Sequence, residues 1–222
     1  RVDQLGYLPN GLDLSRFDQP HGPRQYAKVV YVSSPDRGLG NLLNTWPVIR
    51  HIEPAAELHI FYGFENFQRA MQQGHGYLQA VQDRLLELGK QPGVFWRGRV
   101  DQQTLAKEML ESELLLYTTL FLETSWISGA EAMAADLFIV ASKCGNIPNQ
   151  LGDVGAAIDG VATSELYQRR FLAATQAYLN DTLVRVGSRG LGPRRIRELQ
   201  FTWDRSVESW LSALGAKELV HV

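Results

Sequence analysis

Two glutamates separated by seven residues form the first pattern in this sequence that could bind a ligand. Glu123 and Glu131 flank a loop that leads into a predicted helix opening near Ser128. A carboxylate at such a loop–helix junction can hold the vicinal hydroxyls of a ribose, and the earlier carboxylate, with the loop N–H groups, could hold a second sugar. Ser128 to Glu131 also fits a capping box, in which the Glu131 side chain accepts from the Ser128 N–H. Taken by itself, the segment favours the capping box.

A second segment, residues 33–40 (Ser-Ser-Pro-Asp-Arg-Gly-Leu-Gly), has the residue types that bind phosphate. It precedes a predicted helix, whose N-terminus offers free N–H groups and a partial positive charge. Arg37 can also grip phosphate oxygens through two parallel hydrogen bonds. An ordinary loop, with Asp36 capping the helix and Arg37 in solvent, explains the segment equally well. Neither a Walker pattern nor a complete Gly-x-Gly-x-x-Gly fingerprint is present, so a P-loop ATPase or a standard NAD domain is not supported.

Both segments follow predicted strands. A third segment at the same kind of position, the Gly/Pro loop at 141–149, by itself predicts only a turn. Apolar and β-branched runs predict six strands, at 28–33, 57–62, 94–96, 113–117, 137–141 and 154–158. Apolar residues at helical spacing predict the helical segments between and after them, at 39–46, 65–72, 77–88, 102–110, 128–135, 164–180, 181–200 and 204–214.

This alternation predicts an α/β, Rossmann-like fold with a mostly parallel sheet of about six strands and helices on both faces. In such sheets ligands bind beyond the carboxyl ends of the strands, where the polar segments lie. Residues 1–27 contain two loose Gly/Pro stretches and are predicted to be a connector. The chain starts at Arg1 without a methionine, so we expect a fragment of a longer polypeptide.

Composition excludes several classes of protein. The 22 basic and 24 acidic residues give a formal charge of −2, which argues against nucleic acid as the main partner. The arginines at 189, 194, 195 and 197 cluster, but more as a solvated helix face than as an RNA-binding patch. No run approaches the roughly 18 to 20 apolar residues of a membrane span. One cysteine, Cys144, excludes a disulfide framework and a cysteine-cluster zinc site, and the five histidines lack metal-ligand spacing.

Six short motifs occur in order along the chain: Leu8 to Asp13 with Phe17, Arg37-Gly38-Leu39, Gly98-Arg99-Val100, Glu123 to Ala134, Gly145 to Pro148, and Phe201 to Asp204 with Trp210. In that order they resemble the motifs of the retaining glycosyltransferases of the GT-B fold, family 4, in their C-terminal nucleotide-sugar-binding domain. Those motifs are Pro-Asn-Gly-(Val/Ile)-Asp…Phe, Lys/Arg-Gly, Gly-x-Val, Glu–seven residues–Glu, Gly-Gly-x-Pro-Glu and Phe-(Ser/Thr)-Trp. The resemblance covers most of the chain and outweighs the capping box as the role of Glu131, although one side chain can serve in both.

The resemblance implies a role for each motif. Arg37, with the N–H groups at Gly38 and Leu39, would neutralise the departing diphosphate, Glu123 would orient the donor sugar, and Glu131 would hold the ribose. Arg37 and Glu123 are therefore the predicted catalytic residues. The predicted nucleotide-sugar contacts are Ser33, Ser34, Arg37, Gly38, Leu39, Val100, Glu123, Thr124, Ser125, Trp126 and Glu131. The resemblance implies neither a metal nor a cofactor.

It also implies a division of the molecule. Residues 28–200 would bind the nucleotide sugar, and residues 201–222 would form a helix packed toward an absent N-terminal domain. That domain would hold a glycan, lipid or protein acceptor, so the fragment is expected to bind a nucleotide but to transfer little. We expect a cytoplasmic location. For the full-length protein, a position at the periphery of a membrane is the alternative.

Three departures from the family pattern keep other functions open. Thr124-Ser125-Trp126 replaces the usual Gly-Phe-Gly, Asn149 replaces the glutamate that ends the Gly/Pro loop, and Ser33-Ser34 with a single Arg37 replaces an arginine and a downstream lysine. The alternatives are a nucleotide-sugar epimerase of the GT-B type and a non-catalytic nucleotide-sugar-binding module. The donor base, the sugar and the acceptor are not encoded in these motifs.

Overall fold

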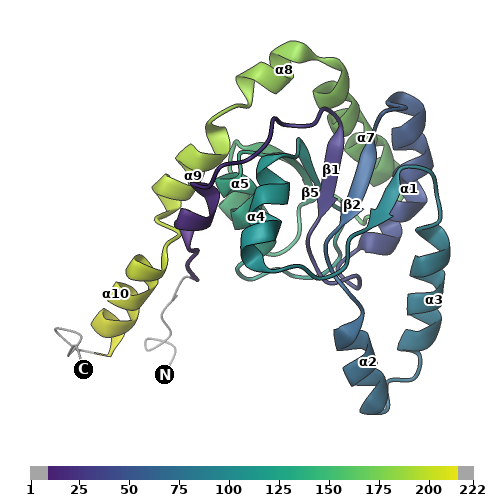
Figure 1. The fold of residues 1–222 in the computed structure, drawn as a ribbon, viewed down its shortest axis with the longest axis horizontal. Coiled ribbons are helices and arrows are strands. Elements are labelled where there is room, and N and C mark those ends of the chain that lie inside the picture. The colour runs from purple at the N-terminus through teal and green to yellow at the C-terminus, as the bar shows by residue number, and fades with distance from the viewer. Residues whose placement is uncertain (1–9, 215–222) are drawn as a thin grey trace.

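A six-stranded parallel β-sheet forms the centre of the computed structural model, which describes residues 10–214 (Figure 1). Its strands are β1 (Lys28–Tyr31), β2 (Glu57–Ile60), β3 (Val94–Trp96), β4 (Leu114–Tyr117), β5 (Phe138–Ser142) and β6 (Gly155–Ile158). They lie in the order β3-β2-β1-β4-β5-β6. The predicted Rossmann-like α/β fold is therefore confirmed, and the strand order reverses direction between β1 and β4.

The two central strands explain why their sequences are almost continuously apolar. Every residue of β1 and β4 is buried, because neighbouring strands and covering helices enclose both of them. Val29 pairs with Leu114 and Val30 with Leu115 across this central seam. Lys28 is the one charged residue in these two strands. It is buried too, and its Nζ lies 2.8 Å from the Glu108 carboxylate.

Two layers of helices cover the sheet (Figure 1). One layer contains α1 (Leu39–Ile52), α3 (Leu78–Leu88) and α7 (Glu165–Asn180), with α1 in contact with the other two. The opposite layer contains α4 (Gln102–Leu110), α5 (Ile127–Ala134) and α9 (Leu191–Leu199). The remaining helices are α2 (Glu65–Gln72), α6 (Ile147–Leu151), α8 (Thr182–Gly187) and α10 (Trp203–Ala213). Figure 1 shows α10 and α2 projecting on either side of the carboxyl edge of the sheet.

The structure corrects several of the predicted bounds. Helix α1, predicted at 39–46, continues to Ile52. The strands predicted at 28–33 and 57–62 each end two residues earlier, where the pairing of β1 with β2 stops. The helical segment predicted over 181–200 is two helices, because Gly190 adopts a left-handed φ of 77° at the start of α9 and breaks the first helix. The loop predicted at 141–149 contains the start of α6, whose first turn accommodates Pro148 because a proline there has no N–H to lose.

The predicted connector packs against the rest of the chain over the part that the structure describes; Leu8 and Pro9 lie outside the described residues. Leu12 is buried and forms a parallel β-bridge with Thr202. A side chain at Gly11 would place its Cβ 2.3 Å from the Trp203 backbone nitrogen, so only glycine allows this approach. A 3₁₀ helix, η2 (Leu14–Phe17), then packs on α4.

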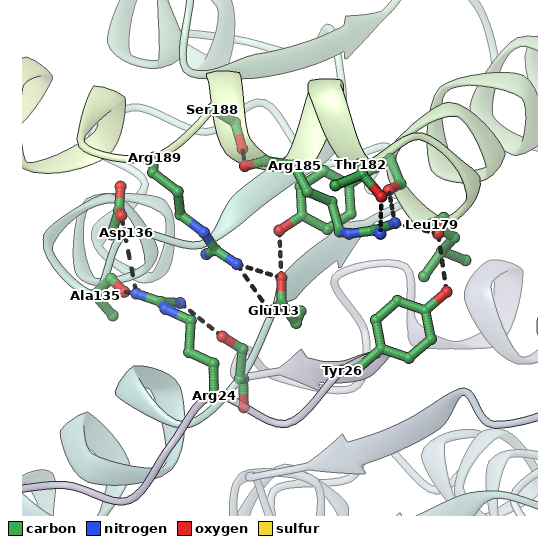
Figure 2. A network of polar contacts seen from close by, with 12 residues as sticks. Arg24, Tyr26, Glu113, Ala135, Asp136, Leu179, Thr182, Arg185, Ser188 and Arg189 are labelled. Atoms are coloured by element: carbon green, nitrogen blue, oxygen red, sulfur yellow. Dashed lines mark hydrogen bonds and ion pairs between the residues drawn. The ribbon is translucent and has the colours of Figure 1, made fainter.

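A buried polar network holds the amino edge of the sheet, at the end opposite the predicted site (Figure 2). Glu113, just before β4, accepts two hydrogen bonds from Arg189 at 2.8 and 2.7 Å and one from the Tyr178 hydroxyl. Arg24 donates to the carbonyls of Ser112 and Ala135 at 2.7 and 2.5 Å. The network ties the link between α8 and α9 to the sheet. Arg189, one of the four clustered arginines, therefore has a structural role.

Candidate functional site

A cavity of about 520 Å³ opens at the carboxyl edge of the sheet, where the strand order reverses between β1 and β4. Clefts at this point bind ligands in open parallel sheets. The cavity is lined by Asn10, Val32, Ser33, Ser34, Arg37, Tyr62, Phe121, Glu123, Thr124, Ser125, Trp126, Ile127, Ser128 and Glu131. Eight of the eleven predicted contact residues therefore share one cavity, including Arg37, Glu123 and Glu131.

Arg37 and Glu123 form the centre of this cavity. Nη1 of Arg37 donates to Oε1 of Glu123 at 3.1 Å, and the Tyr117 hydroxyl donates to the same oxygen at 2.7 Å. Ser33 Oγ lies 3.2 Å from that hydroxyl. Burial raises the pKa of Tyr117 well above its ordinary value, so Tyr117 is a neutral hydrogen-bond donor. The Arg37 guanidinium also lies 3.2 Å from the centre of the Phe121 ring, which holds it by a cation–π contact.

These contacts exclude the simple loop interpretation of residues 33–40. Arg37 is held by a carboxylate and an aromatic ring and does not extend into solvent. Asp36 does not cap α1, because the N-cap residue is Gly38 and no side chain caps this helix. Arg37 is instead directed by its partners toward the cavity that Glu123 also lines.

Gly38 determines how closely the start of α1 approaches the end of β4. Its φ is +101°, and a Cβ there would lie 2.1 Å from the Thr118 carbonyl oxygen. The Thr118 hydroxyl in turn donates to the Gly38 carbonyl at 2.8 Å. Gly38 and Leu39 do not line the cavity, and the Leu39 side chain is fully buried in the core. Neither residue therefore contributes to the wall of the cavity, and their contact with a ligand stays a prediction.

Glu131 also lines the cavity and does not form the predicted capping box. Helix α5 begins at Ile127, so Ser128 is inside the helix, and the N-cap residue Trp126 makes no side-chain cap. Oε1 of Glu131 instead accepts from Nη1 of Arg16, in η2, at 3.3 Å. Burial raises the pKa of Glu131, and the charge of Arg16 opposes that rise.

Trp126 has an unusual backbone for a large residue. Its φ of +30° and ψ of 63° lie in the left-handed region, which costs about 1 to 3 kcal/mol for a residue other than glycine. The indole is buried against Gly129, where a Cβ would lie 2.2 Å from the ring, and it lies 5.6 Å from the Tyr117 ring. Its Nε1 and the neighbouring Ser125 Oγ are buried and find no hydrogen-bond partner among residues 10–214. Trp126 therefore fills a site where the resembled family has a glycine.

Sequence reasoning missed several residues of the site. Arg16 was inside the predicted connector, and only its position one residue before Phe17 in the first motif could have indicated it. Tyr62, which follows β2, and Phe121, which follows β4, also line the cavity, but no spacing in the sequence marks them. Val100, predicted as a contact, packs at the edge of the hydrophobic core and does not line the cavity.

Within residues 10–214 no group of three or more His, Cys, Asp or Glu side chains is arranged to hold a metal ion. Among the same residues, no helix has the length and apolar character of a membrane span. Arg194 and Arg195 of the arginine cluster form ion pairs with Asp153 and Glu198, as on a solvated helix face.

Comparison with known proteins decides the family. Residues 27–181, more than half of the chain, match the family model described as Glycosyl transferases group 1. The chain belongs to this family. The matched part of the chain contains both β1 and β4, and with them Arg37, Glu123 and Glu131. No curated protein matches the sequence.

Solved glycosyltransferase structures share the fold of this group 1 family member. A mutant of TarM from S. aureus, in complex with fondaparinux, α-GlcNAc-glycerol and UDP, has a TM-score of 0.66 at 15% identity over 96% of this chain and 38% of its own. HepE from Anabaena, in complex with UDP and glucose, has a TM-score of 0.70 at 14% identity over 97% of this chain and 58% of its own. Sucrose-phosphate synthase from Thermosynechococcus elongatus has a TM-score of 0.65 at 18% identity, over 94% and 51%. The chain thus spans between about two fifths and three fifths of the length of these proteins.

Proposed function

We propose that this chain is the donor-binding half of a retaining glycosyltransferase, of the family 4 type, that takes a nucleoside-diphosphate sugar. The observation that carries the proposal is the shared cavity: Arg37, Glu123 and Glu131 line one space at the point where the strand order reverses. One cation and two carboxylates at this edge suit a ligand with a diphosphate between two hydroxylated rings.

Arg37 neutralises the diphosphate as it leaves. Negative charge grows on the leaving group in the transition state, so a preorganised cation stabilises the transition state more than the bound donor. The Glu123 carboxylate and the Phe121 ring hold the guanidinium before the ligand arrives, which reduces the reorganisation that the reaction requires. By analogy with the loss of one preorganised donor, removal of Arg37 costs about 3 kcal/mol, or roughly 10²-fold in rate.

The two carboxylates bind the two ends of the donor. Glu131 accepts hydrogen bonds from the ribose hydroxyls, and Arg16 keeps its side chain in place. Glu123 accepts from hydroxyls of the donor sugar and does not attack the sugar. No residue is assigned as the base: in retaining transfer of this type, the leaving phosphate oxygen takes the proton of the acceptor. The reaction uses no metal and no cofactor beyond the donor.

The acceptor is a glycan, lipid or protein held largely by a further domain of the whole protein. Helix α10 is the element that packs toward that domain, since Trp203 and Trp210 on it are 52% and 53% exposed. We infer that the 222-residue chain alone binds nucleotides but transfers sugar slowly or not at all. The whole protein is cytoplasmic or peripheral to a membrane.

Calorimetric titration of the chain with UDP, GDP and their sugars tests the proposal. We expect one nucleoside diphosphate to bind, and the Glu131→Ala variant to bind it at least tenfold more weakly. Gln176→Ala, an exposed position on α7 remote from the site, is the matched control and should bind as the unchanged chain does. Failure of every nucleotide to bind the folded chain would contradict the proposal and favour a degenerate module. Release of a free epimerised sugar in the absence of an acceptor would favour an epimerase.

A further inference from the structure

Tyr117, the last residue of β4, is fully buried behind the proposed donor cavity and does not line it. Its hydroxyl donates to Oε1 of Glu123 at 2.7 Å. We propose that Tyr117 is a positioning residue for the donor sugar: it fixes the Glu123 carboxylate so that the other oxygen accepts a hydrogen bond from a sugar hydroxyl in the cavity. The inference rests on the proposed function for the role of Glu123, and it adds the residue that holds Glu123 in place.

The two carboxylate oxygens of Glu123 have different surroundings. Oε1 accepts from the Tyr117 hydroxyl and from Nη1 of Arg37, the second bond at 3.1 Å. Oε2 accepts no hydrogen bond from residues 10–214, and it is not enclosed in the way that the unpartnered polar atoms of Ser125 and Trp126 are. Because the Glu123 side chain lines the cavity and is 12% exposed, Oε2 is the acceptor that a ligand there reaches.

The opposite edge of the sheet has the same three residue types in a different arrangement (Figure 2). Glu113 accepts from Nη2 of Arg189 on both of its oxygens, at 2.8 and 2.7 Å, and from the Tyr178 hydroxyl on Oε2. Both oxygens of Glu113 are thus taken by the protein, as expected of a carboxylate with a structural role. At Glu123 both donors instead share one oxygen, so the other oxygen is left for a ligand.

Arg37 alone is a poor support for Glu123 when the donor binds. The proposed function assigns the diphosphate to Arg37, whose side chain is 28% exposed. A guanidinium that turns toward phosphate oxygens weakens its bond to Glu123. Tyr117 is the donor that stays on Oε1, because its ring is packed between the rings of Trp126 and Tyr31, at 5.6 and 6.1 Å.

The Tyr117 hydroxyl also restricts the carboxylate before the ligand arrives. The last torsion of a glutamate side chain is broad, so a carboxylate without fixed partners takes up many orientations. Burial raises the pKa of Tyr117 well above its ordinary value, so the hydroxyl keeps its proton and remains a donor. Because Glu123 is ordered when the chain folds, less free energy is lost to ordering when the sugar binds.

Calorimetric titration of the 222-residue chain tests the inference. The probes are UDP, UDP-glucose, UDP-N-acetylglucosamine, GDP and GDP-mannose. We expect Tyr117→Phe to weaken the nucleotide sugar about 3- to 10-fold more than it weakens the matching nucleoside diphosphate, the range that corresponds to one hydrogen bond. Glu123→Ala should give a selective loss at least as large. The double variant Tyr117→Phe/Glu123→Ala should lose no more than Glu123→Ala does, because the hydroxyl acts through the carboxylate.

Tyr178→Phe is the matched control. It also removes a buried hydroxyl that donates to a carboxylate beside an arginine, but at the opposite edge of the sheet. It should lower stability and leave the ratio of the two affinities, for nucleotide sugar and for nucleotide, as it is in the unchanged chain. Tyr117→Leu, which suits the leucine-rich strand β4, provides a second variant without the hydroxyl and should show the same selective loss as Tyr117→Phe.

The other results overturn the inference. An equal loss for the nucleotide and its sugar in the folded Tyr117 variants, or no loss, would remove Tyr117 from sugar positioning and leave the proposed function standing. The same selective loss in Tyr178→Phe, or a further loss in the double variant, would show that the hydroxyl does not act through Glu123. Binding of a nucleoside diphosphate without any of its sugars would reject the sugar contact of Glu123. Absence of all nucleotide binding would reject the inference together with the proposed function.

Discussion

Arg37 and Glu123 are 86 residues apart in the sequence, yet their side chains lie 3.1 Å apart at the carboxyl edge of the sheet. Arg37 follows β1 and Glu123 follows β4, so the ion pair joins the two halves of the doubly wound sheet where they meet. The Arg37 side chain remains 28% exposed, against 12% for Glu123. The guanidinium is thus held by the carboxylate on one side and reachable by a ligand on the other.

Removal of the Arg37 charge should weaken nucleotide binding. A hydrogen bond to a charged group contributes about 1.5 to 3 kcal/mol, so we expect Arg37→Ala to lower the UDP affinity by about 10- to 100-fold. Arg37→Lys keeps the charge but loses the planar guanidinium group, so its UDP affinity should lie between those of Arg37→Ala and the unchanged chain. Calorimetric titration measures all three proteins. Equal affinity of Arg37→Ala and the unchanged chain would remove Arg37 from the site.

The raised pKa of Glu131 predicts a pH-dependent nucleotide affinity. The ionised carboxylate accepts hydrogen bonds from both ribose hydroxyls, whereas the protonated form loses acceptor capacity. Because burial raises the pKa of Glu131 above its ordinary 4.5, UDP affinity should fall as the pH falls through that raised value. Removal of the opposing charge in Arg16→Gln should move this fall to higher pH. UDP titrations at a series of pH values upward from 4.5, the ordinary pKa of the carboxyl, are the measurement.

Glu131→Gln provides the control for this pH profile. Its amide does not titrate, so any remaining pH dependence belongs to the phosphates of UDP or to other groups. The stability effect has a definite sign as well: the folded state favours the protonated Glu131, so its contribution to the free energy of unfolding declines as pH rises through the raised pKa. Identical profiles for Arg16→Gln and the unchanged chain would contradict the coupling of Arg16 to Glu131.

Gly38→Ala should destabilise the fold. Alanine at a φ of +101° is strained, and its Cβ would lie 2.1 Å from the Thr118 carbonyl oxygen, so we expect a loss of about 2 kcal/mol or more in the free energy of unfolding. Gly74 has nearly the same φ, +99°, with open space around it. Gly74→Ala should therefore lose only the strain, about 1 kcal/mol. Urea unfolding of both variants separates the clash from the strain, and equal losses would disprove the close approach.

Glu113→Gln should lower stability without changing the donor site. Glu113 is buried but Arg189 is 34% exposed, so loss of the carboxylate charge should cost about 1 to 3 kcal/mol, the range for a charged hydrogen bond with one partner removed. Glu165→Gln breaks an exposed ion pair with Arg169 and should cost about 0 to 1 kcal/mol. Thermal unfolding compares the two, and the UDP affinity of folded Glu113→Gln should be unchanged because Glu113 lies at the opposite edge of the sheet. A large loss of UDP affinity would show that the two edges are coupled.

The sequence by itself determined the layers of the fold and the edge at which the site lies. The apolar runs at β1 and β4 predict strands, and the carboxyl ends of parallel strands meet at one edge, so Arg37 and Glu123 were expected at the same edge. These features follow from local patterns of hydrophobicity and from the geometry of parallel sheets. The six ordered motifs then indicated a glycosyltransferase family, and the comparison places the chain in the family described as Glycosyl transferases group 1.

Only the tertiary structure decided which partners the polar side chains have. Because α5 begins at Ile127 rather than Ser128, Glu131 does not cap the helix. Its side chain instead pairs with Arg16, which is 115 residues away in the sequence. A second cavity, of about 540 Å³, likewise lies between α6 and the junction of α9 with α10, where Gln200 takes a left-handed conformation. Such pairings depend on where helices begin and how layers pack, and no local spacing encodes them because many partners are compatible with the same local sequence.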